Sequence, residues 1–143
     1  RLAQPDAALA REIVLRFAED PWSASPYAFA ADLLAQVSSG SEADDDDARE
    51  RRRDTLVLFV RLLAFAVRDL GLLALGLQGA ALIHSDREAG LSATAARLDA
   101  DDLFLAAEAC ESAVADLFRN VDPPLVLEEL AAAVRRSCRC VPA

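Results

Sequence analysis

Apolar residues recur at spacings of three and four along most of the chain, which is typical of helices that bury one face. Short groups of Pro, Ser and Gly interrupt this pattern and predict breaks between successive helices. The segment from Gly76 to Gly79 can end the longest of them, because glycine is the usual left-handed residue at a helix end. The expected helices cover residues 5–19, 26–37, 48–78, 86–98, 100–120 and 123–136. The pattern therefore predicts an all-α protein, a bundle of five or six helices around one long central helix.

The expected central helix carries two apolar lines. The first line consists of Leu56, Phe59, Leu63, Ala66, Leu70, Leu73 and Leu77, and the second consists of Leu58, Leu62, Phe65 and Leu72. A helix that is apolar around most of its circumference has to be buried on more than one side. We expect one side to face the core of the domain and the other to be available to a neighbouring subunit.

Length and charge narrow the classes of function. At 143 residues the chain has room for one domain with a substantial core, so we expect residues 1–143 to form a single helical domain. Its net charge is −9, although all 15 basic residues are arginine. A surface that binds a nucleic-acid duplex needs positive charge to displace counterions, and we therefore expect no direct nucleic-acid binding.

Membrane insertion and secretion are disfavoured as well. Arg61, Arg68 and Asp69 lie inside the long apolar segment, and each would cost about 2.5–3.5 kcal/mol at the centre of a bilayer. The first residues lack the basic and then apolar pattern of a signal peptide, and the three cysteines fit a reducing compartment. We expect a cytoplasmic location and no membrane contact.

Two segments are expected to lie outside the helices. Residues 38–48 combine serines with a run of acidic residues, which predicts a solvated acidic loop that leads into the central helix. Residues 137–143 contain Cys138 and Cys140, but no further ligands lie nearby to complete a four-coordinate metal site. We therefore expect this segment to be a frayed tail.

The sequence contains no pattern that we can assign to catalysis, cofactor binding or metal binding. His84, Ser85 and Asp86 have the residue types of a catalytic triad, but adjacent residues cannot reach the geometry of one. There is no G-x-x-x-x-G-K-[ST] phosphate-binding loop, and the acidic helix faces lack the histidines of a di-metal bundle. We expect a domain that is not an enzyme, and we expect His84 to be an ordinary connector residue beside a helix cap.

The segment from Asn120 to Leu130 combines several constraints on a joint between two helices. Asn tolerates the left-handed conformation at a helix end, so Asn120 is expected to end the first helix. Asp122 can cap the next helix, and Pro123 can open it because a missing N–H group costs nothing there. Any helical hairpin could use such a joint, so only the whole segment is specific.

This segment resembles the Asn-x-Asn-Pro-x-Leu-x-Leu-Glu motif of bacterial DNA polymerase III clamp-loader subunits, of the delta-prime type first and the gamma/tau type second. The matching positions are Asn120, Pro123, Leu125, Leu127, Glu128 and Leu130. Upstream, residues 67–76 and 82–86 resemble that family's Arg-Asp-Leu and Leu-Ile-Asn-x-Asp segments in the same order and spacing. The similarity covers about residues 55–136, and the departures from it are His84, Asp122 and Pro124.

The resemblance implies the carboxy-terminal collar domain of a clamp-loader subunit, with an AAA+ module upstream of Arg1. Such a domain would serve oligomerisation and act as a scaffold for sliding-clamp loading in DNA replication, and its partners would be the other clamp-loader subunits. Arg68 and Asp69 would make polar contacts that fix register, either within the domain or between subunits. The other expected interface or structural residues are Asn120, Asp122, Pro123, Leu127 and Glu128.

Two further classes of function stay open. The chain could be a stand-alone helical adaptor or regulatory domain that binds a partner helix in a groove. AAA+ sequence immediately upstream in the gene would distinguish the collar domain from this alternative. An all-helical enzyme is disfavoured because His, Cys and carboxylates do not cluster, and stoichiometric metal binding would revive that hypothesis.

Overall fold

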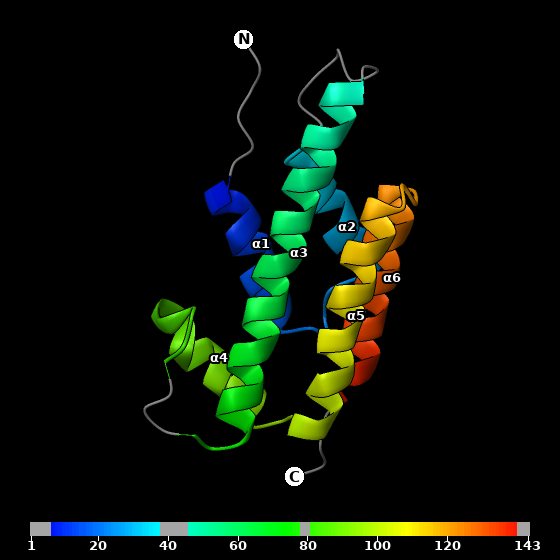
Figure 1. The fold of residues 1–143 in the computed structure, drawn as a ribbon. Coiled ribbons are helices and arrows are strands. Elements are labelled where there is room, and N and C mark those ends of the chain that lie inside the picture. The colour runs from blue at the N-terminus through cyan, green and yellow to red at the C-terminus, as the bar shows by residue number, and fades with distance from the viewer. Residues whose placement is uncertain (1–6, 38–45, 78–80, 140–143) are drawn as a thin grey trace.

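Six α-helices and one short 3-10 helix make up the residues that the computed structural model describes, 7–37, 46–77 and 81–139, and no strand occurs among them. The helices are α1 (Ala7–Glu19), α2 (Pro26–Ala35), α3 (Asp46–Ala74), η1 (Ser85–Arg87), α4 (Glu88–Ala95), α5 (Ala100–Phe118) and α6 (Pro123–Ser137) (Figure 1). The predicted all-α fold class is confirmed.

The 29-residue helix α3 organises the packing of the other helices. It contacts α5 on one side and α1 and α4 on the other, while α6 packs against α5 and α2 (Figure 1). Helices α5 and α6 form an antiparallel hairpin, and α2 lies behind α3 in this view. The prediction of one long central helix is therefore correct.

The first predicted apolar line of α3 is buried in the core as far as Leu70, whereas Leu73 is only partly buried and Leu77, beyond the end of the helix, is 49% exposed. Its residues Leu56, Phe59, Leu63, Ala66 and Leu70 each expose 3% or less of their surface. They share one hydrophobic cluster with buried residues of every other α-helix, including Val14, Leu15, Phe29, Leu33, Leu91, Leu103, Leu117, Leu127 and Val134. The second line is covered only in part, because Leu58 and Phe65 stay 62% and 41% exposed.

Helix α3 begins earlier than the sequence pattern indicates. Asp46 and Asp47 form its first turn, so the expected loop at 38–48 is wrong for its last three residues. Carboxylates are stabilised near the positive end of the helix dipole, which explains why this acidic run can start a helix. Residues 38–45 lie outside the part of the chain that the structure describes.

The helix also ends earlier, at Ala74, and the predicted stop at Gly76 is confirmed. Gly76 has a φ of 72°, a left-handed conformation that glycine adopts without a steric penalty. Its N–H group donates to the Leu73 carbonyl at 3.0 Å, and the N–H group of Leu77 donates to the Leu72 carbonyl at 3.2 Å. These two hydrogen bonds satisfy carbonyl groups at the end of the helix.

The expected frayed tail is wrong for its first two residues. Ser137 is the last residue of α6, and Cys138 is 1% exposed. The Trp22 indole N–H donates to the Cys138 carbonyl oxygen, and Arg97 lies 4.1 Å from the Trp22 ring centroid. Burial raises the pKa of the Cys138 thiol to about 11. The sequence pattern missed these contacts because Trp22 is 116 positions away; Cys140 lies outside the described residues.

Ion pairs join α1 to the start of α4. Arg87 pairs with Glu12 at 2.5 Å and also with Glu19, and Arg11 pairs with Asp86 at 2.5 Å. The hydrogen bond from Arg87 lowers the pKa of Glu12, and the hydrogen bond from Arg11 lowers the pKa of Asp86. Both carboxyl groups therefore favour their ionised form in the folded chain.

The close approach of α4 to α1 also depends on a glycine. A Cβ atom at Gly90 would collide with the Glu19 carboxylate that pairs with Arg87. The Thr94 hydroxyl, one turn further along α4, donates to the Glu19 backbone carbonyl at the end of α1. Glu19 is thus held through both its side chain and its backbone.

The contribution of the Arg87 ion pairs to the stability of the fold should depend on pH. A carboxyl group with a lowered folded-state pKa contributes stability above its ordinary pKa of 4.5 and loses it as the pH falls through the folded value. Arg87→Gln should therefore melt below wild type near pH 7, and this difference should shrink below about pH 4. Circular-dichroism melts at both pH values measure it, with exposed Arg135→Gln as the control. A pH-independent difference would contradict the ion-pair origin.

A change from leucine to aspartate should have opposite outcomes on the buried and on the exposed side of α3. Leu63 is 0% exposed, so Leu63→Asp should place an unpaired charge in the core, cost several kcal/mol (about 4 or more) and unfold the domain. Leu58→Asp, on the exposed side of the same helix, should change the melting temperature little. Circular dichroism and urea titration of both variants check this. A folded Leu63→Asp variant would contradict the assigned core.

Candidate interaction surfaces

The Asp69 carboxylate holds the connector after α3 against that helix. Asp69 is 0% exposed and accepts the backbone N–H groups of Ile83 at 3.1 Å and His84 at 2.8 Å. Arg68 completes the arrangement, since its guanidinium lies 3.1 Å from Asp69 Oδ1 and also donates to the Ala81 carbonyl at 3.3 Å. The carboxylate thus satisfies backbone donors that a buried connector would otherwise leave without partners.

The sequence left open whether Arg68 and Asp69 fix register within the domain or between subunits. Through these contacts the pair holds the connector against α3 within the domain, and a contact between subunits stays a prediction. The Arg68 side chain nevertheless stays 48% exposed and belongs to the outer side of α3.

His84 is a structural residue that the sequence pattern did not reveal. It is 2% exposed, and its ring Nε2 lies 3.4 Å from the Leu62 carbonyl oxygen. Ser85, which resembled a helix cap, is instead the first residue of η1, and α4 begins three residues later. His84 does lie in the connector, as predicted, but its burial was not predicted because its partners lie 15 and 22 positions upstream.

The joint between α5 and α6 adopts the predicted left-handed conformation at Asn120, whose φ is 61°. The Asn120 N–H group donates to the Leu117 carbonyl at 3.2 Å, and the Val121 N–H group donates to the Asp116 carbonyl at 3.1 Å. This is the same pair of hydrogen bonds that ends α3 at Gly76. An asparagine can take this position because its short polar side chain tolerates the left-handed region.

Asp122 occupies the expected capping position before α6, but its side chain makes no capping hydrogen bond. Pro123 and Pro124 follow it and have no N–H group, so the first helical donor available to a cap is on Leu125. Pro123 does open the helix, as predicted. The start of α6 is therefore set by the two prolines more than by the carboxylate.

The segment that resembles the clamp-loader motif lies partly in the core and partly in a groove beside α6. Leu127 and Leu130 are 0% and 2% exposed and pack in the core, whereas Leu125 is 60% exposed. Leu125 and Glu128 line a groove of about 610 Å³ between α6 and the start of α2. We call this the α2/α6 groove; the other residues that line it are Ser25, Pro26, Tyr27, Glu129 and Ala132.

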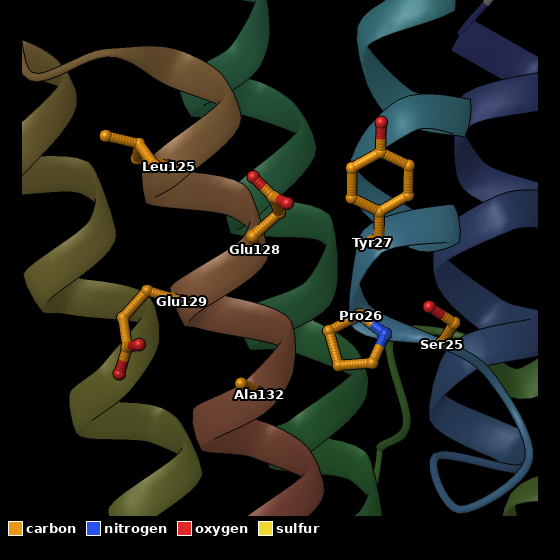
Figure 2. Close-up of a pocket in the computed structure, with 7 residues that line it drawn as sticks. All are labelled: Ser25, Pro26, Tyr27, Leu125, Glu128, Glu129 and Ala132. Atoms are coloured by element: carbon orange, nitrogen blue, oxygen red, sulfur yellow. The ribbon is translucent and has the colours of Figure 1, made fainter.

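Figure 2 shows how the walls of the α2/α6 groove face one another. The Tyr27 ring projects from α2 on one side, and the Glu128 carboxylate points from α6 toward it. Glu129 points away from α2, and it pairs with Arg136 at 3.0 Å. Glu128 makes no ion pair with the described part of the chain. The groove therefore combines exposed apolar and aromatic surface with one available carboxylate.

The opposite side of the bundle carries a second apolar surface, which we call the α3/α5 face. Helices α3 and α5 lie in front of α2 and α6 in Figure 1, whereas α3 lies behind them in Figure 2. The large apolar residues of this face are Leu58 and Phe65 of α3 and Phe104 and Phe118 of α5, which are 62%, 41%, 67% and 50% exposed. Exposed apolar groups of this kind often mark a binding surface.

The joint residues line a further cavity at the end of the bundle. Asn120, Asp122 and Pro123 border a space of about 500 Å³ together with Arg49, Arg52, Arg53, Leu34, Val37, Leu56, Leu117, Val121 and Pro124. Arg53 is already paired with Asp54 at 3.0 Å and with Glu50 at 3.7 Å. The cavity lies between α2, α3 and the joint.

Besides these surfaces, the described residues offer no reactive thiol, no group of metal ligands and no membrane-spanning helix. The Cys110 thiol is buried in α5, and this burial raises its pKa to about 12, so it stays protonated at neutral pH. Over the described ranges, His, Cys, Asp and Glu form no group of three that could hold a metal ion. No described helix is both long and apolar enough to cross a membrane.

Comparisons with models of known protein families, with curated proteins and with solved structures find no match to this chain. Any function assigned to the chain therefore depends on its residues and on their arrangement.

The two members of the Arg68–Asp69 pair should differ strongly in their effect on stability. Asp69→Ala leaves the His84 N–H group buried without an acceptor and should lower the free energy of unfolding by about 2–4 kcal/mol. Arg68→Ala removes a half-exposed partner and should cost about 1 kcal/mol or less. Urea titrations measure both values. Equal losses would show that the ion pair, and not the backbone contacts, carries the effect.

Proposed function

We propose that this chain is an oligomerisation and scaffold domain of a bacterial clamp-loader subunit of DNA polymerase III, of the delta-prime type or, second, the gamma/tau type. In this role it is a non-catalytic, cytoplasmic domain. It holds subunits together while other parts of the complex load the sliding clamp. Its partners are the other clamp-loader subunits.

The observation that carries this proposal is that the exposed Leu125 and the half-buried Glu128 line the α2/α6 groove. Both belong to the segment that resembles the clamp-loader motif, whose other leucines are buried. Burial in the core explains Leu127 and Leu130, whereas Leu125 and Glu128 line the α2/α6 groove. A partner that covers the groove would bury the apolar surface of Leu125.

The chemistry of the groove favours a particular kind of partner segment. Tyr27 and Leu125 offer apolar contact, and Glu128 offers a carboxylate that pairs with arginine or lysine. A helix with apolar residues along one face and a basic residue beside them fits this combination. The partner subunit is therefore expected to contribute an amphipathic helix with a basic residue on its edge.

A scaffold that joins more than two subunits also needs more than one surface. The α2/α6 groove and the α3/α5 face lie on opposite sides of the bundle, so two partners could bind without overlap. This arrangement supports the scaffold proposal. A stand-alone adaptor could use the α2/α6 groove for a single partner helix, and AAA+ sequence upstream of Arg1 in the gene distinguishes the two functions.

Light scattering of the chain mixed with its cognate clamp-loader subunits tests the proposal. We expect a stoichiometric hetero-complex, and Leu125→Asp and Glu128→Arg should each weaken it by about tenfold or more, because both side chains line the groove. Leu105→Asp is the matched control, since Leu105 is 54% exposed on α5 and does not line the groove. Failure of every cognate subunit to bind would reject the clamp-loader role.

A further inference from the structure

We infer that the α3/α5 face binds the same face of a second copy of this chain, about a two-fold axis parallel to the helices. The inference rests on the proposed function only in treating the domain as a scaffold. It concerns a surface that the partner in the α2/α6 groove does not use.

Both helices contribute large apolar side chains to this surface at heptad spacing. Leu58 and Phe65 are seven positions apart on α3, and Phe104 and Phe118 are fourteen positions apart on α5. A spacing of seven residues keeps side chains on one side of a helix and is typical of helices that pack along their length. The partner is therefore expected to present helices nearly parallel to α3 and α5.

The level of each residue along the face follows from one contact between the helices. The Arg53 guanidinium of α3 lies 4.9 Å from the ring centroid of Phe118 of α5, and the two helices run antiparallel (Figure 1). With a rise of about 1.5 Å per residue, Arg61 lies about 12 Å along α3 from Arg53. In the same direction, Glu111 lies about 10 Å along α5 from Phe118. Arg61 and Glu111 therefore lie at nearly the same level.

The apolar residues match in the same way. Phe65 lies about 18 Å from Arg53, and Phe104 lies about 21 Å from Phe118, so both share a second level. Leu58 lies about 8 Å from Arg53, between the level of Phe118 and that of Arg61 and Glu111. The half-exposed Arg68, about 22 Å from Arg53, shares the level of Phe104, so the face carries both apolar and charged residues along its length.

A two-fold axis parallel to the helices exchanges the two sides of this face without changing any level. It places α3 of one copy opposite α5 of the other, so each Arg61 faces Glu111 of the other copy, with Glu108 one turn away. Phe65 of each copy meets Phe104 of the other. The face is therefore complementary to itself in both charge and apolar pattern, which a two-fold dimer requires.

The charges on this face are available for such pairing. Arg61, Glu108 and Glu111 are all exposed, and none of them forms an ion pair with the described part of the chain. Each copy has a net charge of −9, which opposes association unless charges of opposite sign meet locally. The placement of an arginine opposite two glutamates meets that requirement.

Sedimentation equilibrium of the 143-residue chain in moderate salt, from about 5 to 500 μM, tests the inference. Wild type should dimerise within this range. Arg61→Glu and Glu111→Arg should each weaken the dimer by about tenfold or more, because symmetry repeats each like-charge contact twice. The double variant should dimerise like wild type, since it restores both pairs with reversed polarity.

Net charge provides an internal control. Arg61→Glu makes the chain more negative and Glu111→Arg makes it less negative, so a general charge effect would move the two dissociation constants in opposite directions. All three variants should keep the melting temperature of wild type, because both positions are exposed. A wild-type chain that stays monomeric, or a double variant as weak as the single variants, would overturn the inference.

The outcome separates this inference from the proposed function. A monomeric chain that still forms the hetero-complex through the α2/α6 groove would reject the dimer and leave the scaffold role intact. A dimer that obeys the charge exchange but binds no clamp-loader subunit would do the reverse.

Discussion

Burial of one side of α3 is the constraint on which the rest of the structure depends. Leu63 and Ala66 are fully buried at its middle, and α1, α4 and α5 all pack against it. Transfer of this apolar line out of water is the main favourable term available to a helical domain of this size. Since the packed helices leave one side of α3 open, Leu58 and Phe65 stay exposed, and the α3/α5 face is a direct consequence of the core arrangement.

Two local polar features determine where the chain turns between helices. Asp69 accepts backbone N–H groups of the connector and so positions η1 and α4, while the left-handed Asn120 turns the chain from α5 into α6. In each case a short polar side chain or an unusual backbone conformation satisfies groups that burial would otherwise leave unpaired. The position of α6 in turn forms one wall of the α2/α6 groove.

The two apolar surfaces have different chemistry. The α2/α6 groove pairs an aromatic ring with an acidic side chain, whereas the α3/α5 face combines exposed apolar residues with exposed charged residues of both signs. Binding at one surface leaves the other free because the bundle lies between them (Figures 1 and 2).

The sequence by itself determined the helices, the core line of α3 and the two turns at Gly76 and Asn120, because periodicity and left-handed residues act over a few positions. The expected positions of both ends of α3 and of the start of the tail were wrong, because residues that favour a helix and residues that end one lie close together there. Only the tertiary structure decided that His84 and Cys138 are buried and that Leu125 and Glu128 share a groove with Tyr27. Those outcomes depend on contacts between residues far apart in the chain, and no local pattern encodes such contacts.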